Sequence, residues 1–211
     1  MAGISTLRTT ASRLDDHDEA TRSSLLADCL AHRDKMMKWY SQRKKALGGA
    51  PTSCLPGQSL HTRLRPAEGL FGLPYAFSSI DNARYHVLFW AALSILQNII
   101  GRAQSHPILC PDAREEYLLS EFYADEMCRA MPWLLQSTFN AWGAHGTLFG
   151  VAQIGIVYLE FNQLDKFLWA QHALCMMGED GSDFAYRLHD YFAYRWKLLN
   201  GGGWNFASVS S

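Results

Sequence analysis

The most restrictive feature of the sequence is an apolar stretch near the middle of the chain. The segment VLFWAALSILQNII, residues 87–100, contains only three polar side chains and is bounded by Arg84 on one side and Arg102 on the other. A membrane-spanning helix needs about 20 predominantly apolar residues, and a run near fourteen is more typical of a buried helix. We therefore expect residues from about 80 to 103 to form a central helix that other helices cover, and not to cross a membrane.

The remaining pattern is also helical. Apolar residues at helical spacing, with Gly, Pro and capping residues between the runs, predict five further helices. They lie at about 15–47, 112–131, 143–161, 163–177 and 182–199. No segment shows the clean alternation that is typical of strands. The sequence thus predicts one all-α domain over residues 1–211, an irregular bundle of about six helices around the central apolar helix.

Three segments stand apart from this bundle. Residues 1–14 and 200–211 are expected to be frayed ends. Residues 48–79 are rich in Gly, Pro and Ser and are expected to form a long loop. Loops of this length in a compact domain are often functional.

Charge and cysteine usage restrict the class of protein. The chain has 19 basic and 20 acidic residues and a formal net charge of −1, whereas a surface that binds a phosphate backbone needs a concentrated basic face. We therefore expect no direct nucleic-acid binding by this chain.

The five cysteines are scattered and form no CxxC pair, and the N-terminus lacks the apolar core of a signal peptide. These features predict a nuclear or cytoplasmic protein that is not secreted.

Motifs for metal and cofactor chemistry are absent. The acid cluster DDHDE at residues 15–19 suits the positive end of a helix dipole and has no second metal-binding stretch to accompany it. HExxH, Glu-x-x-His, GxSxG, the Walker loop and GxGxxG do not occur. We expect no metal site and no cofactor.

Some side chains remain candidates for chemistry if the protein is an enzyme. The acid–base candidates flank the most apolar helices and are His86, Tyr123, Asp125 and Glu126. Carboxylates in such positions are more often solvated or ion-paired. The candidates for an apolar ligand pocket are aromatic and are Trp39, Tyr40, Phe89, Trp90 and Trp169. Aromatic residues at helical spacing are more often plain core.

The order and texture of the helices resemble a known family. A first helix, ADCLAHRDKMMKWYSQRKK, precedes a Gly/Pro-rich loop and then LFGLPYAFSSIDNARYHVLFWAALSILQNIIGRA. AREEYLLSEFYADEMCRAMPWLLQ and GTLFGVAQIGIVYLEFNQLDKFLWAQHAL follow. This series, roughly residues 22–199, is similar to the all-helical C-terminal regulatory region of fungal zinc-cluster transcription factors, the fungal-specific transcription factor domain. The six-cysteine DNA-binding module of that family does not occur in these 211 residues, so only the regulatory part of the resemblance applies.

The resemblance implies transcription regulation, in the setting of fungal secondary metabolism, through a protein partner or a small apolar metabolite. It transfers no catalytic residue, and it leaves dimer formation open. The alternative is a small all-α enzyme or metabolite-binding protein of a secondary-metabolite pathway, built on the same scaffold. A purely structural or interaction role is the third hypothesis.

Overall fold

The computed structural model describes residues 2–11, 19–46, 48–54, 64, 68–104, 113–137 and 141–201. Within these ranges the protein is all-α, with eight helices and one antiparallel pair of two-residue strands. The elements in chain order are α1 (Ala2–Ala11), α2 (Glu19–Arg43), β1 (Thr52–Ser53), α3 (Glu68–Phe71), β2 (Tyr75–Ala76), α4 (Ile80–Gln104), α5 (Ala113–Ser137), α6 (Ala141–Glu160), α7 (Leu164–Glu179) and α8 (Asp183–Asn200). The predicted fold class is confirmed.

Helix α4 is the centre of the molecule, as the apolar stretch predicted. It packs against α1, α2, α5 and α6, and the side chains of Leu93, Leu96 and Ile100 are completely buried. The Ser79 hydroxyl accepts a hydrogen bond from the backbone N–H of Asn82, which satisfies one of the free donors at the helix start. A helix with apolar side chains all round must be covered on most of its faces. This requirement places α4 between the other helices.

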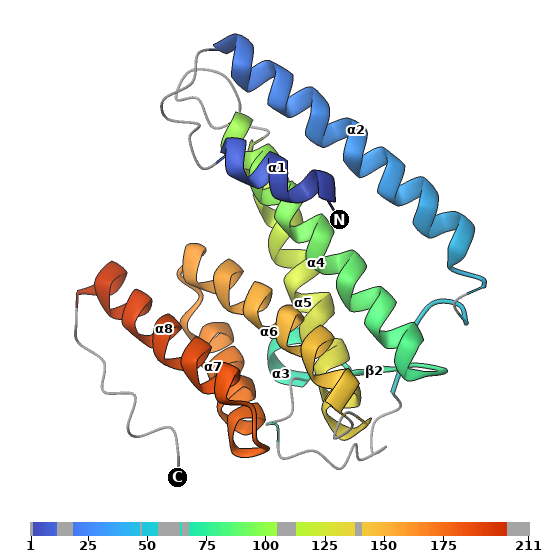
Figure 1. Cartoon of the computed structure of the whole chain (residues 1–211), viewed down its shortest axis with the longest axis vertical. Helices are drawn as coiled ribbons and strands as arrows, with labels where there is room; N and C mark the ends of the chain where they lie inside the picture. The colour runs from blue at the N-terminus through green and yellow to red at the C-terminus, as the bar shows by residue number, and fades with distance from the viewer. Residues whose placement is uncertain are drawn as a thin grey trace.

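Two apolar clusters meet along α4. The larger cluster lies between α4 and α5, α6, α7 and α8, with α3 and β2 at its edge. The smaller cluster joins one face of α4 to α1 and α2 through Ile4, Leu7, Leu25 and Cys29. Figure 1 shows this division, with α1 and α2 on one side of α4 and α7 and α8 on the other. Helix α4 is therefore the element that holds both halves together.

Two predicted irregular segments contain structure. Residues 2–11, which were predicted to be frayed, form α1, because Ile4 and Leu7 bury against α4 and α2. The predicted loop 48–79 contains β1, α3 and β2, and its apolar residues pack at the edge of the larger cluster. Residues 12–18, with most of the DDHDE motif, and residues 202–211 lie outside the described residues.

The predicted end of α5 before Pro132 was also wrong. The helix continues through Pro132 to Ser137. A proline inside a helix loses one backbone hydrogen bond. Met131 and Leu134, on either side of it, are buried in the larger cluster, and this burial offsets the loss. In the part of the chain that the structure describes, no helix combines the length and apolar character needed to cross a bilayer.

Candidate functional site

A groove lies between α2 and α4 in the described structure. Its volume is about 370 Å³, and its lining comes from three helices. The lining residues are Ile4 of α1, His32, Lys35, Met36 and Trp39 of α2, and Tyr85, Leu88, Phe89 and Ala92 of α4. We call this cavity the α2–α4 groove. Pockets for small molecules in proteins have volumes of about 300–1,000 Å³, so the groove lies at the small end of that range.

The amino-acid sequence of α2 explains why the groove stays open. Of its 25 residues, only Leu25 and Cys29, in its first half, are buried. Beyond them the helix contacts α4 through Met36 and Tyr40, which are only partly buried. On the facing side of α4, Tyr85 is therefore left exposed and Leu88 only partly covered. Figure 1 shows the second half of α2 running past the first half of α4.

The two helices present matching stripes to the groove. The lining positions 32, 35, 36 and 39 of α2 follow the spacing i, i+3, i+4, i+7, and positions 85, 88, 89 and 92 of α4 follow the same spacing. Residues at this spacing lie on one face of a helix. Trp39 and Tyr85 are 43% and 45% exposed, so large aromatic rings border the groove where it meets solvent.

The structure brings most of the predicted aromatic residues to this region. Trp39 and Phe89 line the groove. Tyr40 stacks on Phe89 with ring centroids 4.0 Å apart and an angle of 7° between the planes. Trp90, next to Phe89, points instead into the larger cluster and stacks on Tyr75. Of these four predicted pocket residues, Trp39 and Phe89 line the groove, Tyr40 lies behind Phe89, and Trp90 lies in the core.

Trp169 lies elsewhere. It packs edge-on against Phe71 of α3, with ring centroids 5.1 Å apart, inside the larger cluster. Helix α7, which carries it, contributes nothing to the groove. Trp169 is therefore a core residue, and its inclusion in one pocket with Trp39 and Phe89 was wrong.

His86 is buried beneath the end of α2. Its Nε2 atom lies 3.1 Å from the backbone oxygen of Gly49, and its Nδ1 atom lies 2.9 Å from the Tyr40 hydroxyl. A carbonyl oxygen can only accept, so Nε2 carries the hydrogen in the neutral ring, and Nδ1 accepts from Tyr40. Burial lowers the pKa of His86, and the nearby Lys44 ammonium lowers it further, while the hydrogen bond to Gly49 opposes the shift. The ring is a neutral link between α4, α2 and the following turn.

Glu126 belongs to a different group of contacts. Its carboxylate accepts a hydrogen bond of 2.6 Å from the Tyr75 hydroxyl and pairs with Arg129 at 2.8 Å. The Arg129 guanidinium also donates to the backbone oxygen of Leu73 and lies 3.8 Å from the centre of the Tyr75 ring. Burial and the Glu126 carboxylate raise the pKa of Tyr75. These contacts fasten the β2 region to α5.

Asp125 belongs to a separate, partly buried network between α5, α6 and α7. Its carboxylate pairs with Lys166 at 2.8 Å and accepts a hydrogen bond of 2.6 Å from the Tyr158 hydroxyl. Lys166 also pairs with Glu121 at 2.8 Å. The Cys128 thiol lies 3.3 Å from the Tyr158 oxygen, and burial raises the pKa of that thiol well above its usual value. A neutral, enclosed thiol is a poor nucleophile.

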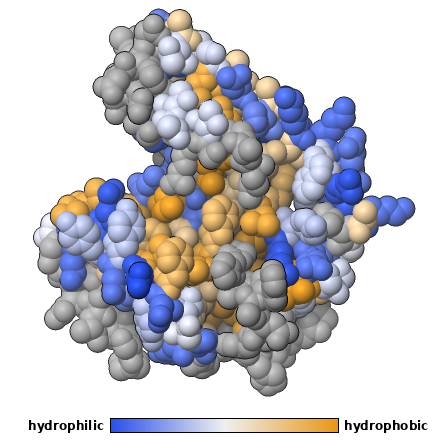
Figure 2. All heavy atoms as spheres, viewed as in Figure 1, coloured by the Kyte–Doolittle hydropathy of each residue, from blue (hydrophilic) through white to orange (hydrophobic). Residues whose placement is uncertain are grey.

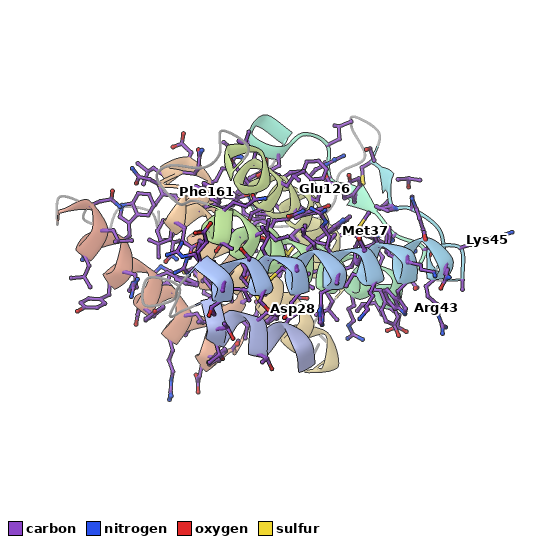
Figure 3. The ribbon with its side chains drawn as sticks, turned by 90° about the horizontal axis from the view of Figure 1, so that it is seen from above. Asp28, Met37, Arg43, Lys45, Glu126 and Phe161 are labelled. Carbon is purple, nitrogen blue, oxygen red and sulfur yellow. The ribbon has the colours of Figure 1, made fainter. Side chains whose placement is uncertain are left out.

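Tyr123, the last acid–base candidate, packs partly buried against the larger cluster, with its ring 5.4 Å from that of Phe122. None of the four acid–base candidates lines the α2–α4 groove. Asp125 and Glu126 are neighbours in sequence but belong to separate networks. Figure 3 shows Glu126 away from the basic end of α2, where Arg43 and Lys45 lie. The geometry therefore provides no assembled acid–base site at the groove.

Several groove residues were not predicted from the sequence. His32, Lys35, Tyr85, Leu88 and Ala92 were missed as ligand-site candidates. The signal that could have found them is the i, i+3, i+4, i+7 spacing, which occurs on both helices. It points to a groove only when the two stripes are considered together, as surfaces that face each other.

Among the described residues, no three His, Cys, Asp or Glu side chains gather in a way that could hold a metal ion. No disulfide joins the four described cysteines. Comparisons of this chain with protein-family models, with curated proteins and with solved structures found no match.

Proposed function

We propose that this chain is a non-enzymatic regulatory domain, similar to the C-terminal regulatory regions of fungal zinc-cluster transcription factors. In this proposal a small apolar molecule binds in the α2–α4 groove and changes how the domain engages a protein partner. The domain acts in the nucleus, and recognition of DNA comes from the partner.

The α2–α4 groove is the observation that carries this proposal. Its walls are mostly apolar and partly open to solvent, with Trp39, Leu88 and Phe89 among the lining side chains. The partly buried ion pairs Asp125–Lys166 and Glu126–Arg129 lie outside it, so intrachain partners occupy these charged groups. An apolar concave site without an assembled acid and base favours binding over catalysis.

Two measurements test the proposal. In gel-shift experiments near physiological salt, the purified chain should form no sequence-specific complex with DNA, because its charges are balanced at 19 basic against 20 acidic residues. Small apolar compounds should bind, and the variant Leu88→Trp, which fills the groove, should reduce that binding. A tight sequence-specific DNA complex, or compound binding that Leu88→Trp leaves unchanged, would contradict the proposal.

The same groove also favours a second function, a metabolite-binding protein or small enzyme of a secondary-metabolite pathway. Profiling a deletion strain distinguishes the two. If one pathway intermediate accumulates while the transcripts of the gene cluster are unchanged, the pathway function is correct. If the transcripts fall together, the regulatory function is correct.

A further inference from the structure

We propose that the ligand of the α2–α4 groove is an organic acid, a molecule with an apolar body and one carboxylate that pairs with Lys35. The inference rests on the proposed ligand-binding function and adds the chemical class of the ligand. It follows from the polar groups at the rim, from the groove's size and from its apolar walls.

The rim of the groove carries hydrogen-bond donors and no acid. Of the nine lining residues, His32, Lys35, Trp39 and Tyr85 carry a polar side-chain group, and none of the nine is Asp or Glu. Lys35 is exposed at the edge, and no described residue pairs with its ammonium group. By contrast, Lys166, which lies near the Phe71 ring of the larger cluster, pairs with two carboxylates. Lys35 is therefore the cation at the groove that is available to an anionic ligand.

One neighbouring hydroxyl agrees with this assignment. The Tyr85 hydroxyl stands on the opposite wall and can donate a hydrogen bond to a second oxygen of the ligand. His32 lies one turn before Lys35, and its Nδ1 atom is 3.2 Å from the backbone oxygen of Asp28. Since that oxygen accepts, Nδ1 carries the hydrogen, and Nε2 of the neutral ring can only accept, so the neutral His32 ring offers no donor to a carboxylate.

The apolar walls define the body of the ligand. Met36, Trp39, Leu88 and Phe89 offer thioether, aromatic and aliphatic surface from two sides, and Ala92 leaves room between them. A volume of about 370 Å³ suits a fused aromatic ring system or a medium alkyl chain. An aromatic acid and an aliphatic acid share the required chemistry.

The test uses matched acids and alcohols on the whole chain. Naphthoate and dodecanoate are titrated by calorimetry at low salt, beside naphthylmethanol and dodecanol, which lack the charge. We expect each acid that fits to bind more tightly than its alcohol. Lys35→Gln should weaken the binding of the acid about twofold to fivefold, the usual range for an exposed ion pair, and leave the alcohol unchanged. Lys38→Gln, on the same helix but outside the groove lining, is the matched control and should change neither.

The outcomes separate this inference from the proposed function. Equal affinity of acid and alcohol, or equal effects of Lys35→Gln and Lys38→Gln, would overturn the organic-acid inference and leave an apolar ligand site. Binding of none of the four compounds would overturn both. A dimer of the unliganded protein that Leu88→Trp dissociates would show that a second copy occupies the groove, which also overturns the inference. A preference for naphthoate or for dodecanoate identifies the aromatic or the aliphatic source.

Discussion

His86 shows how one residue can have a structural role where the sequence suggested a chemical one. Its two ring nitrogens bind Gly49 and Tyr40, so the imidazole ties α4 to the end of α2 and to the turn that follows. A general base needs a free nitrogen within reach of a substrate. Both nitrogens of His86 are occupied inside the protein.

The lowered pKa of His86 predicts a pH dependence of stability. The ordinary pKa of a histidine is about 6.5, and below it His86 takes up a proton more readily in the unfolded chain than in the folded chain. The contribution of His86 to the free energy of unfolding is therefore present above pH 6.5 and is lost as the pH falls below it. The other histidines also titrate, so the comparison needs His86→Gln. The difference in unfolding free energy between wild type and His86→Gln, measured in urea, should shrink between pH 7 and pH 5, by at most about 1.4 kcal/mol per pH unit. A constant difference would contradict the pKa direction.

Helix periodicity shows on which face of a helix a residue lies, but it does not show which other element that face contacts. Trp39 and Phe89 could be chosen because each lies on an apolar face. That Trp90, one position further, points to Tyr75 depends on where β2 packs, which periodicity does not contain. The Asn98 amide donates to Glu160. Gln97 is buried, and its amide oxygen has no hydrogen-bond partner among the described residues.

At the scale of elements, local signals were sufficient for α4 and insufficient for α1 and the 48–79 segment. The apolar run, the cap at Ser79 and the basic Arg102 fix α4 almost to the residue. Helix α1 has no such run, and it depends on contacts of Ile4, Leu7 and Ala11 with helices distant in sequence. The β1–β2 pair likewise depends on Arg129, which reaches Leu73 and Ser53 from α5.

The central position of α4 predicts a large difference between two leucine substitutions. Leu93 of α4 is completely buried, whereas Leu118 of α5 is 54% exposed. Leu93→Ala should lower the unfolding free energy by about 2–5 kcal/mol, because it removes buried methyl groups and leaves a cavity. Leu118→Ala should change it by about 0.5 kcal/mol or less. Urea unfolding followed by circular dichroism measures both, and similar effects would show that α4 is not the core helix.

At the scale of the whole molecule, the fold has a well-covered part and a thinly covered part. Helices α4 to α8 enclose the larger cluster, and Figure 2 shows hydrophobic residues gathered over the middle of the visible face, in the hollow between the α1–α2 part and the α6–α8 part. Helix α2 buries only Leu25 and Cys29. Segments with few buried contacts open more readily than the rest of a protein.

This difference predicts two levels of hydrogen exchange. Backbone amides of residues 35–43 in α2 should exchange through openings that cost less free energy than those of residues 87–100 in α4. Native-state exchange followed by mass spectrometry at low denaturant concentrations separates the two. Equal opening free energies for both segments would contradict the prediction and indicate one cooperative unit.

Because few residues of α2 are buried, the docking of this helix on α4 should depend on whether a ligand occupies the α2–α4 groove. A molecule bound in the α2–α4 groove touches α1, α2 and α4 together. It would therefore bind the closed arrangement, in which α1 and α2 are docked on α4, better than an arrangement in which they are undocked. By linkage it stabilises the closed arrangement by about 2.7 kcal/mol at a concentration 100 times its Kd. Under the proposed function, the amount of ligand in the cell would set the fraction of chains whose first two helices are docked on α4.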